Sequence, residues 1–198
     1  LSGAATAGAL TLAPGQSIGI DFGASTSENQ FNPCDPNTPG SLIGGALPLV
    51  IDTTGATVTG ITVQFAGDLV TTTQNGSLQD FSHYSGFSEA NIQTGLYGSG
   101  LSMTITGLDP LQPFTLDLIC SYSERNIGTE FIVNGIHILT DSTSATGGTL
   151  ARFTNLFADA TGTLTITTLG HDPLGDSRWV GVNAAILTAQ AIPEPQAW

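Results

Sequence analysis

The chain has 198 residues, which is enough for one domain with a hydrophobic core and short for two. Its formal net charge is −13, with three arginines and no lysine. Nucleic acids and anionic membrane surfaces bind proteins through clustered cationic side chains, so this composition argues against both as binding partners. Charged residues make up only 10% of a chain rich in Thr, Ser, Gly and Ala, as in secreted β-rich surface proteins. No apolar stretch reaches the roughly 18 to 20 residues that span a bilayer.

Residues 1–16 are interpreted as an N-terminal segment, followed by a β-sandwich over residues 17–190 and a tail over residues 191–198. The first twelve residues contain no basic side chain, so they are either a mature N-terminus or the end of an incompletely trimmed signal peptide. The apolar residues 9–12 could add to a neighbour's sheet as an extra strand. The alternative is an unstructured leader.

Apolar and polar residues alternate in short runs between turn signals, and this period of two predicts roughly eight or more half-buried β-strands. No stretch shows a helical apolar stripe with caps, so the sequence predicts an all-β, two-sheet sandwich. The apolar positions are Ile18, Ile20 and Phe22; Leu47, Leu49 and Ile51; Ile61, Val63 and Phe65; Leu101, Met103 and Ile105; Phe114, Leu116, Leu118 and Cys120; Phe131 and Val133; Leu164 and Ile166; and Val180, Val182, Ala184 and Ile186.

Cys34 and Cys120 are the only cysteines in the chain. An even count in an exported protein favours one disulfide, which would close a long loop and contribute on the order of 4 kcal/mol to stability. The alternative is two buried free thiols, because cysteine packs like a small apolar residue. The spacing matches no zinc or redox motif.

The dipeptide Asn134-Gly135 separates the alternating residues 131–133 from residues 136–138. Asn and Gly both tolerate the positive φ that a two-residue hairpin turn requires. The sequence therefore predicts a β-hairpin at this position.

Residues 107–116, Gly-Leu-Asp-Pro-Leu-Gln-Pro-Phe-Thr-Leu, and residues 179–187, Trp-Val-Gly-Val-Asn-Ala-Ala-Ile-Leu, carry a resemblance to a known fold family. They are similar to a turn-and-strand and to the closing strand of galactose-binding-like jelly rolls. With residues 17–23 as the opening strand, the resemblance extends from Ser17 to Thr188. It implies a jelly roll; an immunoglobulin-like topology remains the alternative, because those domains also use a Leu-x-Pro turn.

Candidate glycan-binding residues lie on two segments. Tyr122, Arg125 and Asn126 follow a predicted inner strand, and Arg178 and Trp179 begin the last one. Sugar sites combine apolar or aromatic surfaces with planar hydrogen-bonding groups, so these residues form such a site if both segments meet at one end of the sandwich. The alternative is that Trp179 belongs to the core or rim and Arg125 pairs with a neighbouring acid.

Two compact acidic loops offer the oxygen ligands that calcium prefers. The candidates are Asp35 and Asn37 in the first loop, and Asp172 and Asp176 in the second. The jelly rolls that the chain resembles commonly hold structural calcium. Neither loop has the spacing of an EF-hand. Because no cofactor-binding motif is present, no cofactor is expected to be required, and structural calcium is the one candidate ligand.

Catalytic motifs are weak. Gly175-Asp176-Ser177 resembles the nucleophile block of GDSL esterases, but that family carries the block near the N-terminus of an α/β fold, whereas here it lies late in a β-rich chain. A glycosidase needs a pair of carboxyl groups, but 16 acidic residues offer so many pairs that finding one is no evidence for this activity. A noncatalytic protein is expected, with a glycan or ester hydrolase as a distant alternative.

The chain ends with Ile-Pro-Glu-Pro-Gln-Ala-Trp, in which Pro193, Glu194 and Pro195 form the triplet. This tail closely resembles the start of the PEP-CTERM sorting signal, where the triplet precedes a membrane-spanning helix and a basic cluster. In that family an exosortase recognises the tag, and the tagged proteins reach the cell surface or an exopolysaccharide matrix. The helix and basic cluster are missing here, so the chain looks processed or truncated; the alternative is a stiff, extended end.

These features predict a secreted bacterial protein of the cell surface or extracellular matrix, with a structural or adhesive role. Its expected partners are extracellular polysaccharide, copies of itself and, before truncation, an exosortase-type processing enzyme. Two specific versions stay open: a monomeric carbohydrate-binding module, and a filament subunit that exchanges its N-terminal strand.

Overall fold

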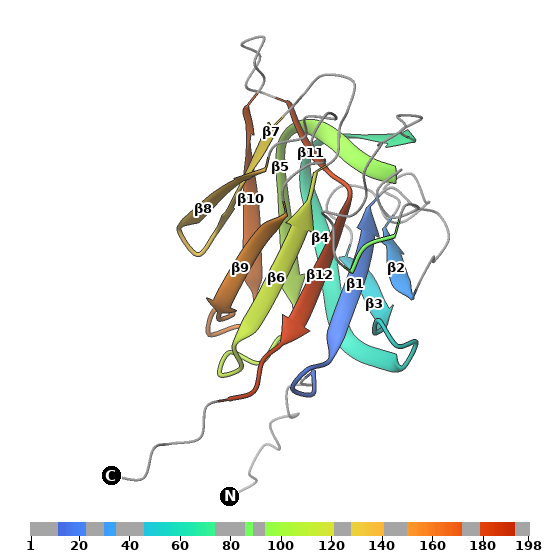
Figure 1. Cartoon of the computed structure of the whole chain (residues 1–198), viewed down its shortest axis with the longest axis vertical. Helices are drawn as coiled ribbons and strands as arrows, with labels where there is room; N and C mark the ends of the chain where they lie inside the picture. Colours follow the sequence, from blue (N-terminus) through green and yellow to red (C-terminus); the bar gives the residue numbers. More distant parts are fainter. Residues whose placement is uncertain are drawn as a thin grey trace, which may run out of the picture.

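The computed structural model describes residues 12–22, 30–34, 46–73, 86–88, 94–120, 128–140, 150–171 and 179–192. Every regular element in these ranges is a β-strand, and the strands form two sheets that pack face to face (Figure 1). This confirms the all-β sandwich predicted from the sequence. The described residues contain no helix that could cross a membrane.

The smaller sheet has the strand order β2-β1-β12-β6-β9. Its first and last strands along the chain are neighbours, because β1 pairs antiparallel with β12. β2 joins the other side of β1 as a parallel strand. The bounds are β1 Ser17–Phe22, β2 Phe31–Cys34, β6 Phe114–Ile119, β9 Ala151–Leu156 and β12 Ala184–Ala189.

The larger sheet has the order β3-β4-β5-β10-β7-β8, and β11 also pairs with β5. The chain passes from one sheet to the other between β2 and β3, β5 and β6, β6 and β7, β8 and β9, β9 and β10, and β11 and β12, which is a jelly-roll arrangement. The bounds are β3 Ala46–Ile51, β4 Thr57–Thr73, β5 Thr94–Thr106, β7 Gly128–Val133, β8 Ile136–Thr140, β10 Leu164–His171 and β11 Trp179–Val182.

Inward-facing residues of both sheets form one core, as the period of two predicts. In β1, Ile18, Ile20 and Phe22 are each at most 1% exposed. Phe22 packs edge-on against Phe65 of the larger sheet, with 5.5 Å between the ring centroids. Apolar burial between the two layers is therefore the main source of stability.

The single alternating run predicted over residues 180–186 is wrong. Asn183 separates β11 from β12, and its main chain bonds to the smaller sheet. Because the chain changes sheets at this residue, Val182 faces the core from the larger sheet and Leu187 faces it from the smaller one. Ile186 consequently packs against a separate cluster instead of the core.

That separate cluster covers part of the outer face of the smaller sheet. It contains Phe31, Phe87, Ile119 and Ala184. The Phe31 ring lies so close to Gly19 that a Cβ on the glycine would be 2.6 Å from it, so only glycine fits there. The outer face of the larger sheet, in contrast, carries an exposed cluster of polar side chains around Glu130.

The Asn134-Gly135 hairpin is confirmed. Both residues have positive φ, 50° for Asn134 and 77° for Gly135, and they connect β7 directly to β8. The turn fixes the register, since Val133 lies opposite Ile136.

The disulfide predicted between Cys34 and Cys120 is not formed, and both cysteines are buried free thiols. Cys34 lies opposite Phe22, whose N–H bonds to the carbonyl of Asn183, and the Asn183 N–H bonds to the carbonyl of Ile119 beside Cys120. Strands β1 and β12 therefore separate the two cysteines. Three strand spacings of about 4.8 Å place their main chains roughly 14 Å apart, beyond the ~7 Å that a disulfide spans.

We expect both thiols to be unreactive in the folded protein. Burial, followed by the charge of Asp21, raises the pKa of Cys34 to about 12, so almost no thiolate is present at pH 8. Mass spectrometry after alkylation should show no label on the native protein and two labels after unfolding without reductant. Labelling that requires prior reduction would contradict this expectation.

At the β2 and β3 edges of the sandwich, the side chain of Asn32 connects the two sheets by hydrogen bonds. Asn32 of β2 donates to the carbonyls of Gly19 and Ile51, at 2.9 and 2.8 Å, and accepts from the N–H groups of Val50 and Ile51, at 2.7 and 3.1 Å. Asn32 is 2% exposed, and the bond of its side chain to the Gly19 carbonyl is fully buried, whereas its three bonds to Val50 and Ile51 are partly buried. Asn32 thereby joins β2 of the smaller sheet to β3 of the larger sheet.

The Asn32→Ala variant should lower the free energy of unfolding by roughly 1–3 kcal/mol, because it leaves four main-chain groups without their partner, one of them in a fully buried bond. Urea denaturation followed by circular dichroism measures the loss. Thr167→Ala, at an exposed position of β10, is the control and should change stability by less than about 0.5 kcal/mol. Equal midpoints for Asn32→Ala and the control would refute the bridging role.

Candidate functional site

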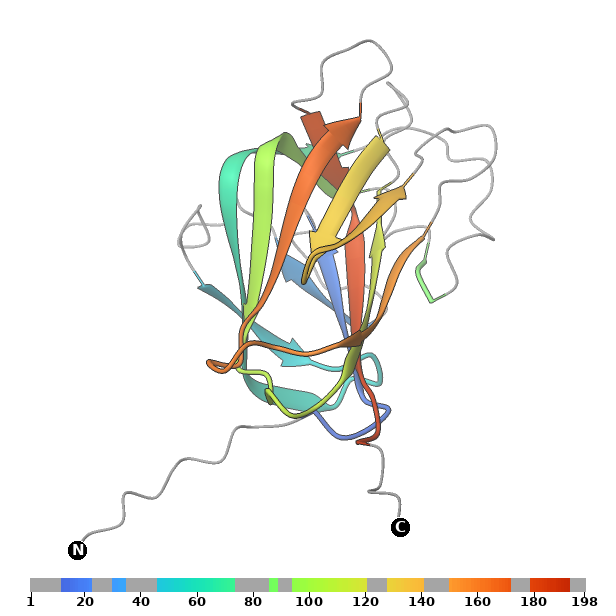
Figure 2. The same ribbon diagram turned by 90° about the vertical axis from the view of Figure 1, so that its left-hand side faces the viewer.

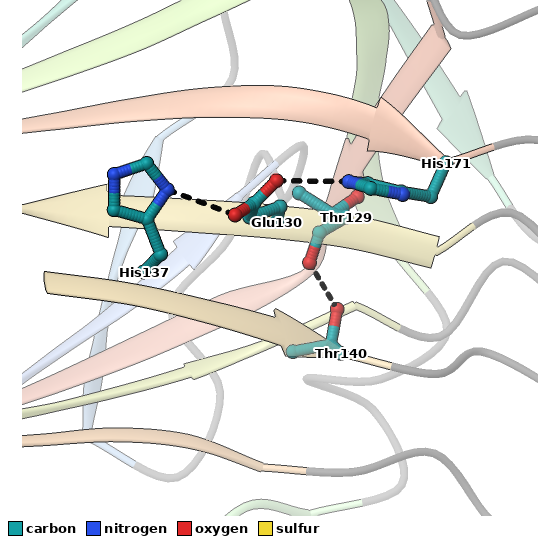
Figure 3. Close-up of polar contacts among 5 residues, drawn as sticks. All are labelled: Thr129, Glu130, His137, Thr140 and His171. Atoms are coloured by element: carbon teal, nitrogen blue, oxygen red, sulfur yellow. Dashed lines mark hydrogen bonds and ion pairs between the residues drawn. The ribbon is translucent and has the colours of Figure 1, made fainter.

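A polar cluster lies on the outer face of the larger sheet, where Glu130 of β7 stands between His137 of β8 and His171 at the end of β10 (Figure 3). The strand register explains this meeting. Glu130 is directly opposite Leu139 of β8 and Leu169 of β10; His137 lies two positions before Leu139, and His171 lies two positions after Leu169. Such residues share a face and approach diagonally, one from each side.

Each histidine contacts a different oxygen of the same carboxylate. His137 Nδ1 is 2.8 Å from Glu130 Oε1, and His171 Nε2 is 2.8 Å from Glu130 Oε2. The histidine side chains are 53% and 49% exposed, against 19% for Glu130. Hydrogen bonds from His171 and then His137 lower the pKa of the Glu130 carboxyl, because they stabilise its charged form.

The cluster has the composition of a recognition surface. Leu139 and Leu169 flank Glu130 and are 52% and 51% exposed. Planar hydrogen-bonding groups beside apolar side chains are the elements that sugar sites use. A glycosidase centre needs two carboxyl groups across a cleft, whereas here one carboxylate is held by two imidazoles.

The predicted glycan-binding residues Tyr122, Arg125, Asn126 and Arg178 lie outside the described residues, as does the side chain of Trp179. The strand residues that flank these two segments are described. The main chain of Trp179 pairs with Ser99 of β5. Whether the five side chains form one site stays a prediction.

The flanking residues of the two segments meet at one end of the sandwich. Gly128 of β7 pairs with His171 of β10. Next to them, the Thr129 hydroxyl is 3.4 Å from Cys120 Sγ and 3.0 Å from the carbonyl of Gly181. The described residues that flank positions 121–127 and 172–178 therefore lie at the same end of the sandwich. We call this end the loop pole.

The other sites that the sequence predicts also lie outside the described residues. They are the calcium candidates Asp35, Asn37, Asp172 and Asp176, and the triplet Pro193, Glu194 and Pro195. In the described ranges, no group of three or more His, Cys, Asp or Glu side chains is arranged to hold a metal ion.

The Glu130 cluster was not predicted from the sequence. The pairing of Glu130 with His137 could have been found, because the two-residue turn fixes the register between β7 and β8. The contact with His171 could not have been found in this way, because His171 lies on β10, whose register with β7 depends on tertiary structure.

A shallow hollow of about 350 Å³ lies at the opposite pole. Its lining includes Gly60, Gly107, Leu108 and Thr161. The glycines are required by backbone packing, because a Cβ on Gly107 would lie 2.0 Å from the carbonyl oxygen of Gly60. With one hydroxyl side chain in its lining, this hollow offers less chemistry than the Glu130 cluster.

Three solved structures share the fold. The ANXUR1 extracellular domain from Arabidopsis thaliana has a TM-score of 0.54 and 13% identity, covering 92% of this chain and 51% of that one. The plant receptor-like kinase ANX2 has a TM-score of 0.53 and 12% identity, covering 92% of this chain and 51% of that one. The ANX1 ectodomain from Arabidopsis thaliana has a TM-score of 0.54 and 13% identity, covering 88% of this chain and 42% of that one. The chain thus spans about half the length of these structures or less.

At these identities the likeness shows the fold alone. No protein-family model matches the chain, and a search of curated proteins finds no match.

The titration of Glu130 tests the cluster. Because its folded-state pKa is lowered, its ionised form stabilises the fold above the unfolded-state value near 4.5, and this contribution is lost as the pH falls through the folded-state value. Carboxyl ¹³C shifts should place the Glu130 midpoint below 4.5, and His137→Gln with His171→Gln should raise it. An unchanged midpoint in the double variant would show that the histidines do not hold the carboxylate.

Proposed function

We propose that this chain is a noncatalytic, secreted protein of a bacterial cell surface or extracellular matrix, with a structural or adhesive role. It associates with exopolysaccharide through the loop pole, and with copies of itself. The Pro193-Glu194-Pro195 triplet supports export and sorting by a PEP-CTERM-type route. The similar solved structures are ectodomains, which agrees with an extracellular location.

The observation that carries this proposal is the separation of the two poles. The Ala189 N–H bonds to the carbonyl of Gln16, which joins the end of β12 to the start of β1. These strand ends lie at the lower end of the sandwich in Figure 2. The loop pole lies at the other ends of these strands, about 17 Å away along the five steps of β12. An attachment through the tail would therefore leave the loop pole facing outward.

The Glu130 cluster supports polysaccharide as the ligand. It lies beside the loop pole, since His171 is the last residue of β10 and pairs with Gly128. Its planar groups can bond hydroxyls, and Leu139 and Leu169 can contact the apolar edge of a sugar ring. Neutral or weakly charged glycans suit a chain of net charge −13 better than strongly anionic ones.

Trp179→Ala should abolish retention of the protein on the exopolysaccharide of the producing bacterium, because it removes the aromatic group of the proposed site. Trp198→Ala is the matched control, being the other tryptophan of the chain, and should be retained normally. Affinity electrophoresis measures retention, and circular dichroism verifies folding. If Trp179→Ala fails to fold, Arg178→Gln with Arg125→Gln provides the same test.

If the folded Trp179→Ala and arginine variants are fully retained, the loop pole does not bind the exopolysaccharide. If the unaltered protein is not retained on the native matrix or on any neutral glycan, association with polysaccharide is refuted.

A further inference from the structure

Four strands lie at the ends of the two strand orders, and three of these edges are protected against pairing. β11 lies off these orders, and the N–H and C=O of its Gly181 bond to the Thr129 hydroxyl. β2 contains Pro33 and β3 contains Pro48, each of which removes an N–H donor from its edge. β9 is bulged, with Asn155 at a φ of 54°, and it carries Arg152, which pairs with Asp117 at 2.7 Å. Prolines, bulges and charged groups are devices that prevent association between edges.

The fourth edge, β8, has none of these devices. Its sequence is Ile-His-Ile-Leu-Thr, without proline or a formally charged side chain, and it pairs with β7 in unbroken register. Ile136 and Leu139 are 46% and 52% exposed. A regular, apolar and uncharged edge is a template for another strand.

The main-chain groups that face away from β7 follow from the hairpin. In a two-residue hairpin the closing pair, here Val133 and Ile136, is hydrogen-bonded, and bonded and non-bonded pairs then alternate. The N–H and C=O groups of His137 and Leu139 therefore face the open side. Within the described ranges no other strand pairs with them.

Residues 1–11 fit this edge as a partner. They carry no charged side chain, in a chain of net charge −13, so this contact between copies avoids repulsion between like charges. When extended, eleven residues reach about 37 Å, far more than the five residues of β8 require.

Leu12 defines where the partner segment can begin. It is 3% exposed in the core of its own domain, and its carbonyl accepts from Gln112 Nε2 at 2.9 Å. The extra strand predicted over residues 9–12 therefore cannot include Leu12 without removing it from this core. The residues that precede Leu12 can extend from a fixed point.

We propose that residues 1–11 of one copy pair with β8 of the next copy and extend its larger sheet by one strand. The inference rests on the structural role proposed above and names the two surfaces that carry it. Because the donor segment and the β8 edge are different surfaces, the contact is heterologous. It repeats head to tail and builds a filament unless the ring closes.

The experiment uses the full chain and two complementary variants. Leu139→Pro removes an outward N–H from β8 and retains the donor segment; deletion of residues 1–11 removes the donor and retains β8. Sedimentation velocity and negative-stain microscopy should show filaments for the unaltered chain and monomers for each variant. An equimolar mixture of the two variants should give a one-to-one heterodimer, because one contact remains possible.

Leu139→Lys is a second way to block the edge, and Thr167→Lys is its control. The control places the same charge at an exposed position of β10, a strand inside the sheet, and should leave assembly unchanged. Leu139→Thr keeps the N–H and should assemble like the unaltered chain.

Several results would overturn the proposal. They are a monomeric unaltered chain, assembly of Leu139→Pro or Leu139→Lys at the normal level, or no heterodimer in the mixture. Assembly that survives the deletion but not Leu139→Pro would show that the occupant is another β8 strand. Retention on polysaccharide, measured on the unaltered chain and on the deletion variant, which keeps Leu139 and the rest of the Glu130 cluster, separates these failures from a failure of the proposed function.

Discussion

The pairing of β1 with β12 is the constraint on which the rest of the structure depends. It places the first and last strands side by side in the middle of the smaller sheet, so both must present apolar residues to the same core. It also fixes the poles, because β1 begins where β12 ends. The strands next to residues 121–127 and 172–178 reach the opposite pole, so the start of β1 and the end of β12 lie at one end of the sandwich and the flanks of these two segments lie at the other.

Local patterns predicted the parts of the fold that depend on local chemistry. The inward residues of β1, β4 and β6 and the Asn134-Gly135 turn follow from alternation and from positive φ. β2 and β9 gave no usable pattern, because β2 contains Pro33 and a buried Asn32, and β9 is bulged at Asn155. The change of sheet at Asn183 and the separation of the two cysteines are consequences of strand order, which alternation does not encode.

The same distinction applies to the candidate site. Glu130 and His137 are joined by a short hairpin whose turn sets their register, whereas His171 reaches them through pairing between strands distant in sequence. The sequence predicts candidate glycan-binding side chains on two separate segments, and the structure brings the residues that flank both segments together at one pole. What the sequence lacked was the strand order β5-β10-β7-β8, which assembles a shared outer face from separate strands.

The proposed association with polysaccharide and the proposed association between copies need not compete, because they would use different atoms of the same strand. The side chains of His137 and Leu139 project from the face that carries Glu130, while their main-chain groups face the open edge of the sheet. A strand added at β8 would move His137 from the margin of the sheet into its interior. The outer face would then be wider, with the Glu130 cluster nearer its middle, so assembly would enlarge the surface available to a glycan chain.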